Sequence, residues 1–119
     1  MKKIKNMKEK ERKITAPEGC ESERELEQQC VTFARSRGWD AWKNENNGNK
    51  GIPDRSFLKK DVFLMVEFKR PDGGGRISKG QLLWKNRHPH TVHFCNSLDD
   101  FKGILECYEK GGEWKEVQK

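Results

Sequence analysis

PDRSFLKKDVFLMVEFK, residues 53–69, is the stretch that decides the fold. It contains two short apolar runs, residues 54–60 and 61–69, which meet at the polar dipeptide Lys60-Asp61. Runs of this length, rich in phenylalanine, leucine and valine and joined by a polar turn, are typical of paired strands. The stretch therefore predicts an antiparallel hairpin centred on Lys60-Asp61.

The predicted hairpin gathers three ionisable side chains at its open end. Its register sets Asp54 directly opposite Glu67, with Cβ atoms about 5 Å apart. Because side chains alternate along a strand, Lys69 shares the face of Glu67. The other positions of the second strand are apolar on both faces, so these charges do not belong to a solvated face. A polar, glycine-bearing loop, residues 44–51, precedes Pro53 and leaves backbone room for a phosphate.

This cluster suits a divalent metal. Mg²⁺ prefers carboxylate oxygens and is usually held by one or two of them, together with waters and a substrate phosphate. Asp54 and Glu67 supply such oxygens, and the backbone carbonyl of Phe68 between the site residues is a further candidate ligand. The metal would activate a water, and Lys69 would orient that water, help to remove its proton or stabilise the transition state. The predicted reaction class is metal-assisted phosphodiester hydrolysis; the alternative is an ordinary cross-strand salt-bridge cluster.

The remaining segments predict an α/β fold. A helix begins near Ser22, carries Leu26, Cys30, Phe33 and Ala34 on one stripe, and ends at Gly38. A strand over residues 39–43 precedes the hairpin, and a helix over 78–87, a strand over 91–95 and a helix from Asn96 or Ser97 to Gly111 follow it. The order α-β-β-β-α-β-α predicts a mixed four-stranded sheet flanked by helices.

Composition sets further limits. The chain has 119 residues, 32% hydrophobic and 37% charged, which predicts one domain with a small core and favours a homodimer. No stretch is apolar enough for a membrane span or a secretion signal, so we expect a cytoplasmic protein. Cys20, Cys30, Cys95 and Cys107 form no close pair and are expected to be free thiols, and His88, His90 and His93 are not expected to bind zinc.

The net charge of +6 is unevenly distributed. Residues 1–19 hold seven lysines and arginines against three glutamates, which predicts a flexible basic arm before a domain over residues 20–119. Such an arm suits attraction to nucleic acid, and a solubilising tail is the alternative.

Three spaced motifs resemble those of the virus-type replication-repair nuclease (VRR-NUC) domain of the PD-(D/E)xK superfamily. They are Gly51-Ile52-Pro53-Asp54, Val66-Glu67-Phe68-Lys69 and Arg76-Ile77-Ser78-x-x-Gln81-x-x-Trp84. The resemblance covers residues 22 to about 105. It implies a restriction-endonuclease-like fold, DNA cleavage dependent on Mg²⁺ or Mn²⁺, metal binding by Asp54 and Glu67, and catalysis by Lys69.

The resemblance also implies a third carboxylate from the first helix, and two residues fit. Glu27 lies at the distance before Gly38 found in Holliday-junction resolvases of the superfamily, whereas Glu23 lies closer to the middle of the apolar stripe. The comparison favours Glu27 and leaves Glu23 open. Lys85 stands where many resolvases have a tyrosine, so a tyrosine role is absent there.

Gln81 has two explanations. Ser78 and Gln81 have the spacing of a helix capping box, in which the glutamine folds back onto the serine. The family motif instead makes Gln81 part of the catalytic site. Around these residues, the expected DNA-phosphate contacts are Lys50, Arg55, Arg76 and Lys79, with plain surface charge as the alternative.

The sequence therefore predicts a homodimeric, structure-selective endonuclease that cuts four-way DNA junctions. The lack of a further domain in the sequence favours junctions, by analogy with compact resolvases. Alternatives are a flap, nicking or restriction-type nuclease, and a non-catalytic DNA-binding module. No nucleotide cofactor is expected, because the run Gly73-Gly74-Gly75 lacks the lysine and hydroxyl residue of a P-loop.

Overall fold

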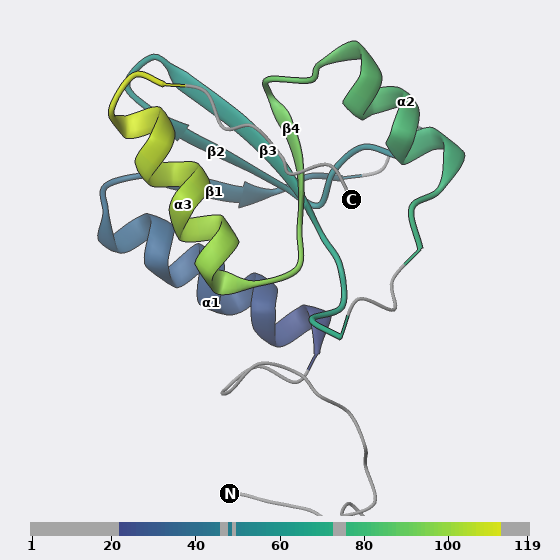
Figure 1. Cartoon of the computed structure of the whole chain (residues 1–119), viewed down its shortest axis with the longest axis horizontal. Helices are drawn as coiled ribbons and strands as arrows, with labels where there is room; N and C mark the ends of the chain where they lie inside the picture. The colour runs from purple at the N-terminus through teal and green to yellow at the C-terminus, as the bar shows by residue number, and fades with distance from the viewer. Residues whose placement is uncertain (1–21, 46–47, 49, 73–75, 113–119) are drawn as a thin grey trace, which may run out of the picture.

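The computed structural model describes residues 22–45, 48, 50–72 and 76–112. The basic arm expected for residues 1–19, Cys20, the glycine run 73–75 and Trp114 lie outside these residues. The elements, drawn in Figure 1, are α1 (Glu23–Ser36), β1 (Asp40–Lys43), β2 (Arg55–Lys59), β3 (Val62–Phe68), α2 (Lys79–Arg87), β4 (Val92–Cys95) and α3 (Leu98–Glu109). Their order is the one predicted from the sequence. No helix in the described part of the chain is both long and apolar enough to cross a membrane.

The strands form one mixed sheet in the order β1-β2-β3-β4. Strand β2 is antiparallel to both β1 and β3, and β4 is parallel to β3. The predicted hairpin register is confirmed, since Arg55 pairs with Val66 and Lys59 with Val62. Lys60 closes the turn between them with a φ of 55°, in the left-handed region.

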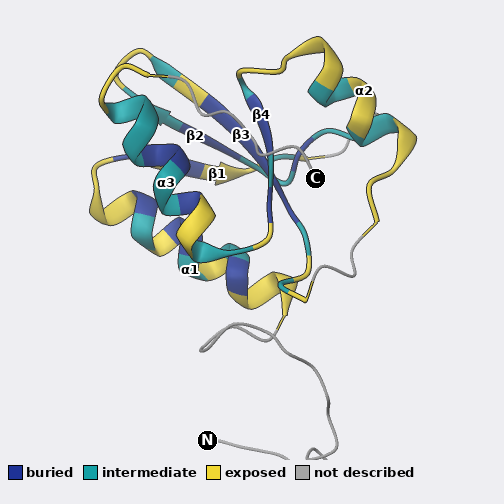
Figure 2. Ribbon diagram, in the orientation of Figure 1, coloured by how far each residue is buried: buried dark blue, intermediate teal, exposed yellow. Residues whose placement is uncertain are grey.

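Helices α1 and α3 lie side by side on one face of the sheet, and the core lies beneath them (Figure 1). The stripe predicted for α1 is buried as expected at Leu26, Cys30 and Ala34. Alternate residues of the central strands and one face of α3 complete this core, coloured dark blue in Figure 2: Phe57, Leu64, Val66, Phe68, Phe101, Ile104 and Leu105. Cys30, Cys95 and Cys107 are free thiols, as predicted.

Helix α2 lies apart from the other two helices, beside β4 (Figure 1). None of its residues is buried, and its side chains Leu82 and Leu83 are 47% and 58% exposed. The Lys85 ammonium donates to the carbonyl of Val92 at 2.8 Å and so ties the helix to the sheet. Trp84, the last residue of the third motif, is half-buried.

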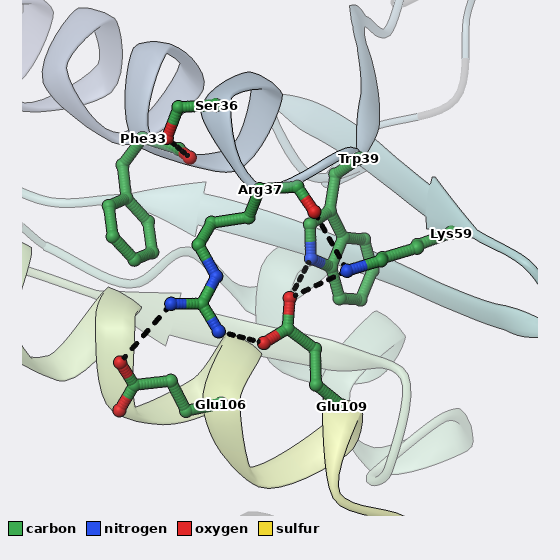
Figure 3. Close-up of polar contacts among 7 residues, drawn as sticks. All are labelled: Phe33, Ser36, Arg37, Trp39, Lys59, Glu106 and Glu109. Carbon is green, nitrogen blue, oxygen red and sulfur yellow. Dashed lines mark hydrogen bonds and ion pairs between the residues drawn. The ribbon is translucent and has the colours of Figure 1, made fainter.

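A second polar cluster fastens the end of α3 to the opposite end of the sheet from Asp54 (Figure 3). The Glu109 carboxylate accepts hydrogen bonds from the Arg37 guanidinium, from Trp39 Nε1 at 2.8 Å and from Lys59 Nζ at 3.1 Å. Burial raises the pKa of Glu109, but the donors from Arg37, Trp39 and Lys59 outweigh it and lower the pKa to about 2. The cluster thus joins three segments far apart in the sequence through one carboxylate.

Replacing Glu109 with glutamine is expected to destabilise the fold at neutral pH by about 1–2 kcal/mol, after discounting for solvent screening. Because the folded-state pKa is depressed, this contribution is present above the ordinary pKa of a glutamate. It is lost as the pH falls toward about 2. Urea unfolding between pH 3 and pH 7 measures it. Glu106→Gln is the matched control, because Glu106 meets the same arginine only at 3.9 Å and is 47% exposed. Equal effects from both variants would contradict this role.

Candidate active site

The residues at the open end of the β2–β3 hairpin converge as the sequence predicts. The register that pairs Arg55 with Val66 continues to Asp54 and Glu67, just beyond the ladder. The Asp54 carboxylate accepts a hydrogen bond from the backbone N–H of Phe68 at 2.9 Å, which locks it across the end of β3. Asn44 fixes the backbone of this segment, because its own N–H donates to the Asp54 carbonyl at 2.9 Å. Asp54 is therefore held rigidly beside Glu67.

Glu67, Lys69 and Gln81 form a connected polar network. The Lys69 ammonium lies 3.5 Å from a Glu67 oxygen and donates to the Gln81 side-chain oxygen at 2.8 Å. The Gln81 amide nitrogen donates to the same Glu67 oxygen at 2.8 Å. Lys69 also donates to the carbonyl of Arg76 at 2.7 Å. The glutamine thus bridges the carboxylate and the amine and fixes both.

The capping box predicted for Gln81 is present, and the same side chain also contacts Lys69 and Glu67. The capping box is formed, with the Gln81 N–H donating to the Ser78 hydroxyl and the Gln81 oxygen accepting from the Ser78 N–H at 3.0 Å. The same side-chain oxygen accepts from Lys69. The helix cap therefore holds the Gln81 side chain in the orientation in which its amide nitrogen donates to Glu67.

The position of the start of α2, which carries this cap, depends on two glycines. Gly51 has a φ of 88°, and a Cβ added there would lie 2.2 Å from the carbonyl carbon of Gly80. Gly80 faces back toward the carbonyl of Lys50 in the same way. The loop before Asp54 and the start of α2 thus touch backbone to backbone. Only a residue without a side chain fits at Gly51, and this contact was not predicted from the sequence.

The electrostatics of the site favour a bound cation. Glu67 is only 6% exposed, and its burial together with the nearby Asp54 carboxylate raises its pKa to about 7, although Lys69 lowers it. Burial also raises the pKa of Asp54, against the lowering effect of the Phe68 N–H. A buried carboxylate whose ionisation is opposed by a neighbouring carboxylate is stabilised by a positive charge beside it.

The donor set fits a hard divalent ion. Asp54 and Glu67 supply two carboxylates, which is the number that Mg²⁺ commonly takes from a protein. Among the described residues, no three histidine, cysteine, aspartate or glutamate side chains are arranged as a metal-binding group. The remaining coordination positions would fall to waters, a phosphate and backbone oxygen, as is usual for Mg²⁺.

The two candidate glutamates of α1 lie in different environments. Glu27 is paired with Arg55, whose Nε lies 2.6 Å from its carboxylate. The pKa of Glu23 is raised by burial and by the Asp54 carboxylate and lowered by Lys69, so Glu23 feels the cluster itself. The charge of Glu27 also raises the pKa of Asp54, so both glutamates act on the cluster, and they differ in that Glu27 is paired with Arg55.

The expected DNA contacts fall into two groups. Lys50, Arg76 and Lys79 are exposed around the start of α2, on the side of the site that carries Gln81. Arg55 lies on the opposite side, toward α1. Two further cations, Arg24 and Lys43, line a cleft with Arg55 and were not predicted from the sequence as part of this group. The register would have indicated Lys43, because Lys43 pairs with Arg55 across β1 and β2.

Comparison with known proteins bears on the fold. No family model and no curated protein matches the sequence. A solved structure described as a VRR_NUC domain is similar to the chain, with a TM-score of 0.63 and 22% sequence identity. The match covers 72% of this chain and 96% of that one. The chain therefore has the fold of a VRR-NUC domain, as its three motifs led us to expect.

Proposed function

We propose that this protein is a metal-dependent DNA endonuclease whose active site is the end of the β2–β3 hairpin. The observation that carries the proposal is the joint Glu67–Gln81–Lys69 network beside Asp54. An ordinary surface salt bridge contributes little to stability and needs no buried carboxylate pair. Here two carboxylates with raised pKa values lie beside Lys69, an arrangement that costs stability and is typical of functional sites.

Asp54 and Glu67 would hold the metal, assisted by the carbonyl of Phe68 and by Glu23. Of the two glutamates that the sequence offers for this place, we propose Glu23, because the Glu27 carboxylate is paired with Arg55. When bound, Mg²⁺ or Mn²⁺ would supply Lewis-acid polarisation of the phosphate and an acidified water.

Lys69 acts as a cation in this arrangement. Its Nζ is surrounded by three acceptors: Arg76 O at 2.7 Å, Gln81 Oε1 at 2.8 Å and Glu67 Oε2 at 3.5 Å. An ammonium has three donors and no acceptor, so this environment matches the protonated form. Of the roles open to Lys69, stabilisation of the charge of the pentavalent transition state is therefore favoured over proton removal.

The substrate we propose is branched DNA, in particular a four-way junction cut by a homodimer. Exposed apolar side chains support pairing with a second copy, because a domain with so small a core gains stability by covering them. They are Trp42, Phe63, Ile77, Leu82 and Leu83. Flap or sequence-specific duplex cleavage is the alternative for the same site, and a non-catalytic DNA-binding module is the rival from another class.

A cleavage panel tests this proposal. Labelled four-way junction, flap and linear duplex are incubated with the protein in Mg²⁺, in Mn²⁺ and in EDTA. We expect products with either metal, none in EDTA, and fastest cleavage of the junction. Lys69→Ala should slow cleavage by about 10²–10³-fold, whereas Lys110→Ala, an exposed lysine at the far end of α3, should not.

Each rival predicts a different outcome of this panel. Equal cleavage rates on junction and linear duplex would contradict the junction preference but not the proposal that the protein is a nuclease. DNA binding without products in any metal would favour the binding module. Wild-type rates from Lys69→Ala would remove the lysine from the mechanism.

A further inference from the structure

A cleft of about 470 Å³ opens between the first turns of α1 and the ends of β1 and β2, next to the metal-binding carboxylates. Its lining mixes opposite charges: Glu23, Arg24, Glu27, Gln28, Lys43 and Arg55. Apart from Glu23 and Arg55, none of these residues has a role in the proposed reaction. The cleft is large enough for a small polar ligand.

The arrangement of cations in the cleft is unusual for a sheet. Lys43 and Arg55 are direct partners in the register of β1 and β2, and like charges opposite each other on one face destabilise a strand pair. Glu27 compensates only one of them, through its 2.6 Å contact with Arg55. Within the described residues, Lys43 and Arg24 make no ion pair shorter than 4 Å. The cleft therefore has spare positive charge that an anion would neutralise.

Residues that line the cleft lie close enough to Asp54 to act on its charge. Arg55 directly follows Asp54 in the chain, and the charges of Lys43 and Glu27 both act on the Asp54 carboxylate. A DNA strand whose scissile phosphate lies at Asp54 and Glu67 would therefore have a neighbouring phosphate within reach of Lys43 and Arg55. A phosphate accepts several charge-assisted hydrogen bonds, and arginine suits it better than a single-point cation does.

We propose that this cleft binds a backbone phosphate of the DNA strand next to the phosphate that is cut, and that Arg55 exchanges its Glu27 partner for this phosphate. The inference rests on the proposed nuclease function and extends it to Lys43 and Arg24, with Glu27 as an internal competitor for Arg55. In the free protein Glu27 holds Arg55 in place and lowers the charge repulsion at the strand ends. Bound DNA displaces the Glu27 carboxylate from Arg55. In the free protein Glu27 therefore occupies the place beside Arg55 that the DNA phosphate takes in the complex.

Binding measurements in EDTA test the exchange without requiring cleavage. Affinity for a labelled four-way junction is measured by fluorescence anisotropy at several salt concentrations. Lys43→Gln should weaken binding about five-fold and make the slope of log K against log salt shallower by about one, the signature of one lost phosphate contact. Lys110→Gln removes the same charge at the far end of α3 and should leave the slope unchanged.

The Glu27 variant gives a result of opposite sign. Glu27→Gln frees Arg55 from its competing carboxylate, so DNA binding should tighten by about three-fold or more. Glu25→Gln removes the same charge from an exposed position on the same helix and measures the general electrostatic effect. Glu27→Gln must exceed this control if Glu27 competes for Arg55.

Two outcomes would overturn the inference: an unchanged salt slope for Lys43→Gln, or equal affinities for Glu27→Gln and Glu25→Gln. Neither depends on catalysis. If the variants behave as expected but the wild-type protein cuts no DNA in Mg²⁺ or Mn²⁺, the nuclease proposal fails and the phosphate site stands. If the protein cuts DNA and the slopes do not change, only the phosphate site fails.

Discussion

Replacing Glu67 with glutamine is expected to abolish DNA cleavage and, at the same time, to stabilise the metal-free fold above pH 7. The loss of activity should be about 10³-fold or more, because the variant removes the charge of a carboxylate that we propose as a metal ligand. Glutamine keeps the shape of the side chain and can still accept the hydrogen bond from Gln81. The variant therefore changes the charge of the site and little else.

The gain in stability follows from the direction of the pKa shift. Burial and Asp54 raise the pKa of Glu67 to about 7 in the folded protein, from an ordinary value of 4.5. The folded chain thus binds more protons than the unfolded chain between these values, and its stability falls as the pH rises through this window. An uncharged glutamine avoids that loss, which is on the order of 2 kcal/mol at pH 8.

Thermal unfolding in EDTA at pH 5 and pH 8, together with cleavage assays, measures both effects. The advantage of Glu67→Gln over wild type should appear at pH 8 and shrink at pH 5. Glu25→Gln, an exposed glutamate, controls for a general change in net charge. A Glu67→Gln variant that cuts DNA within tenfold of wild type, or that is less stable at pH 8, would contradict the account.

The second large effect concerns Gly51. Gly51→Ala is expected to destabilise the fold by about 3 kcal/mol, which combines left-handed strain with a backbone clash. The added Cβ would lie 2.2 Å from the Gly80 carbonyl carbon and 2.6 Å from the Gln81 nitrogen. Relief of this clash requires the start of α2 to move, and Gln81 moves with it. Cleavage should therefore fall by about tenfold or more even where the variant is fully folded.

Gly48→Ala is the matched control for this prediction. Gly48 lies in the same loop with a φ of 84°, but a Cβ there would meet nothing within 4 Å. This variant carries the strain alone and should cost about 1 kcal/mol, without loss of cleavage. Urea unfolding compares the stability that the two variants lose, and single-turnover cleavage compares their activity. Equal costs for Gly48→Ala and Gly51→Ala would mean that the contact with α2 does not matter.

Local pattern was enough to predict the elements and the hairpin. A hairpin centred on the polar Lys60-Asp61 turn has a single strand-pairing register. That register places Asp54 beside Glu67 and puts Lys69 on the same face of the strand as Glu67. The stripes of α1 and α3 were equally readable, because helical spacing selects the buried side chains directly. These features depend on residues close together in the sequence.

Contacts between distant segments could not be predicted in this way. Glu23 and Glu27 are one helical turn apart and equivalent in pattern, and only the position of Arg55 distinguishes them. The contact of Gly51 with Gly80 depends on how α2 returns to the loop, and the partners of Glu109 come from two distant segments, residues 37–39 and Lys59. Gln81 showed its capping role in the sequence, but its contact with Glu67 arises only when α2 is placed against the sheet.

The most direct test of the metal site is a crystal structure of the protein soaked in Mn²⁺, with data collected for anomalous scattering. The account predicts one strong anomalous peak bound by the carboxylates of Asp54 and Glu67, within about 2.3 Å of each, and no such peak in Glu67→Gln crystals. A protein that cuts DNA in Mn²⁺ while its manganese lies elsewhere, or that binds no ion between these two carboxylates, would contradict it.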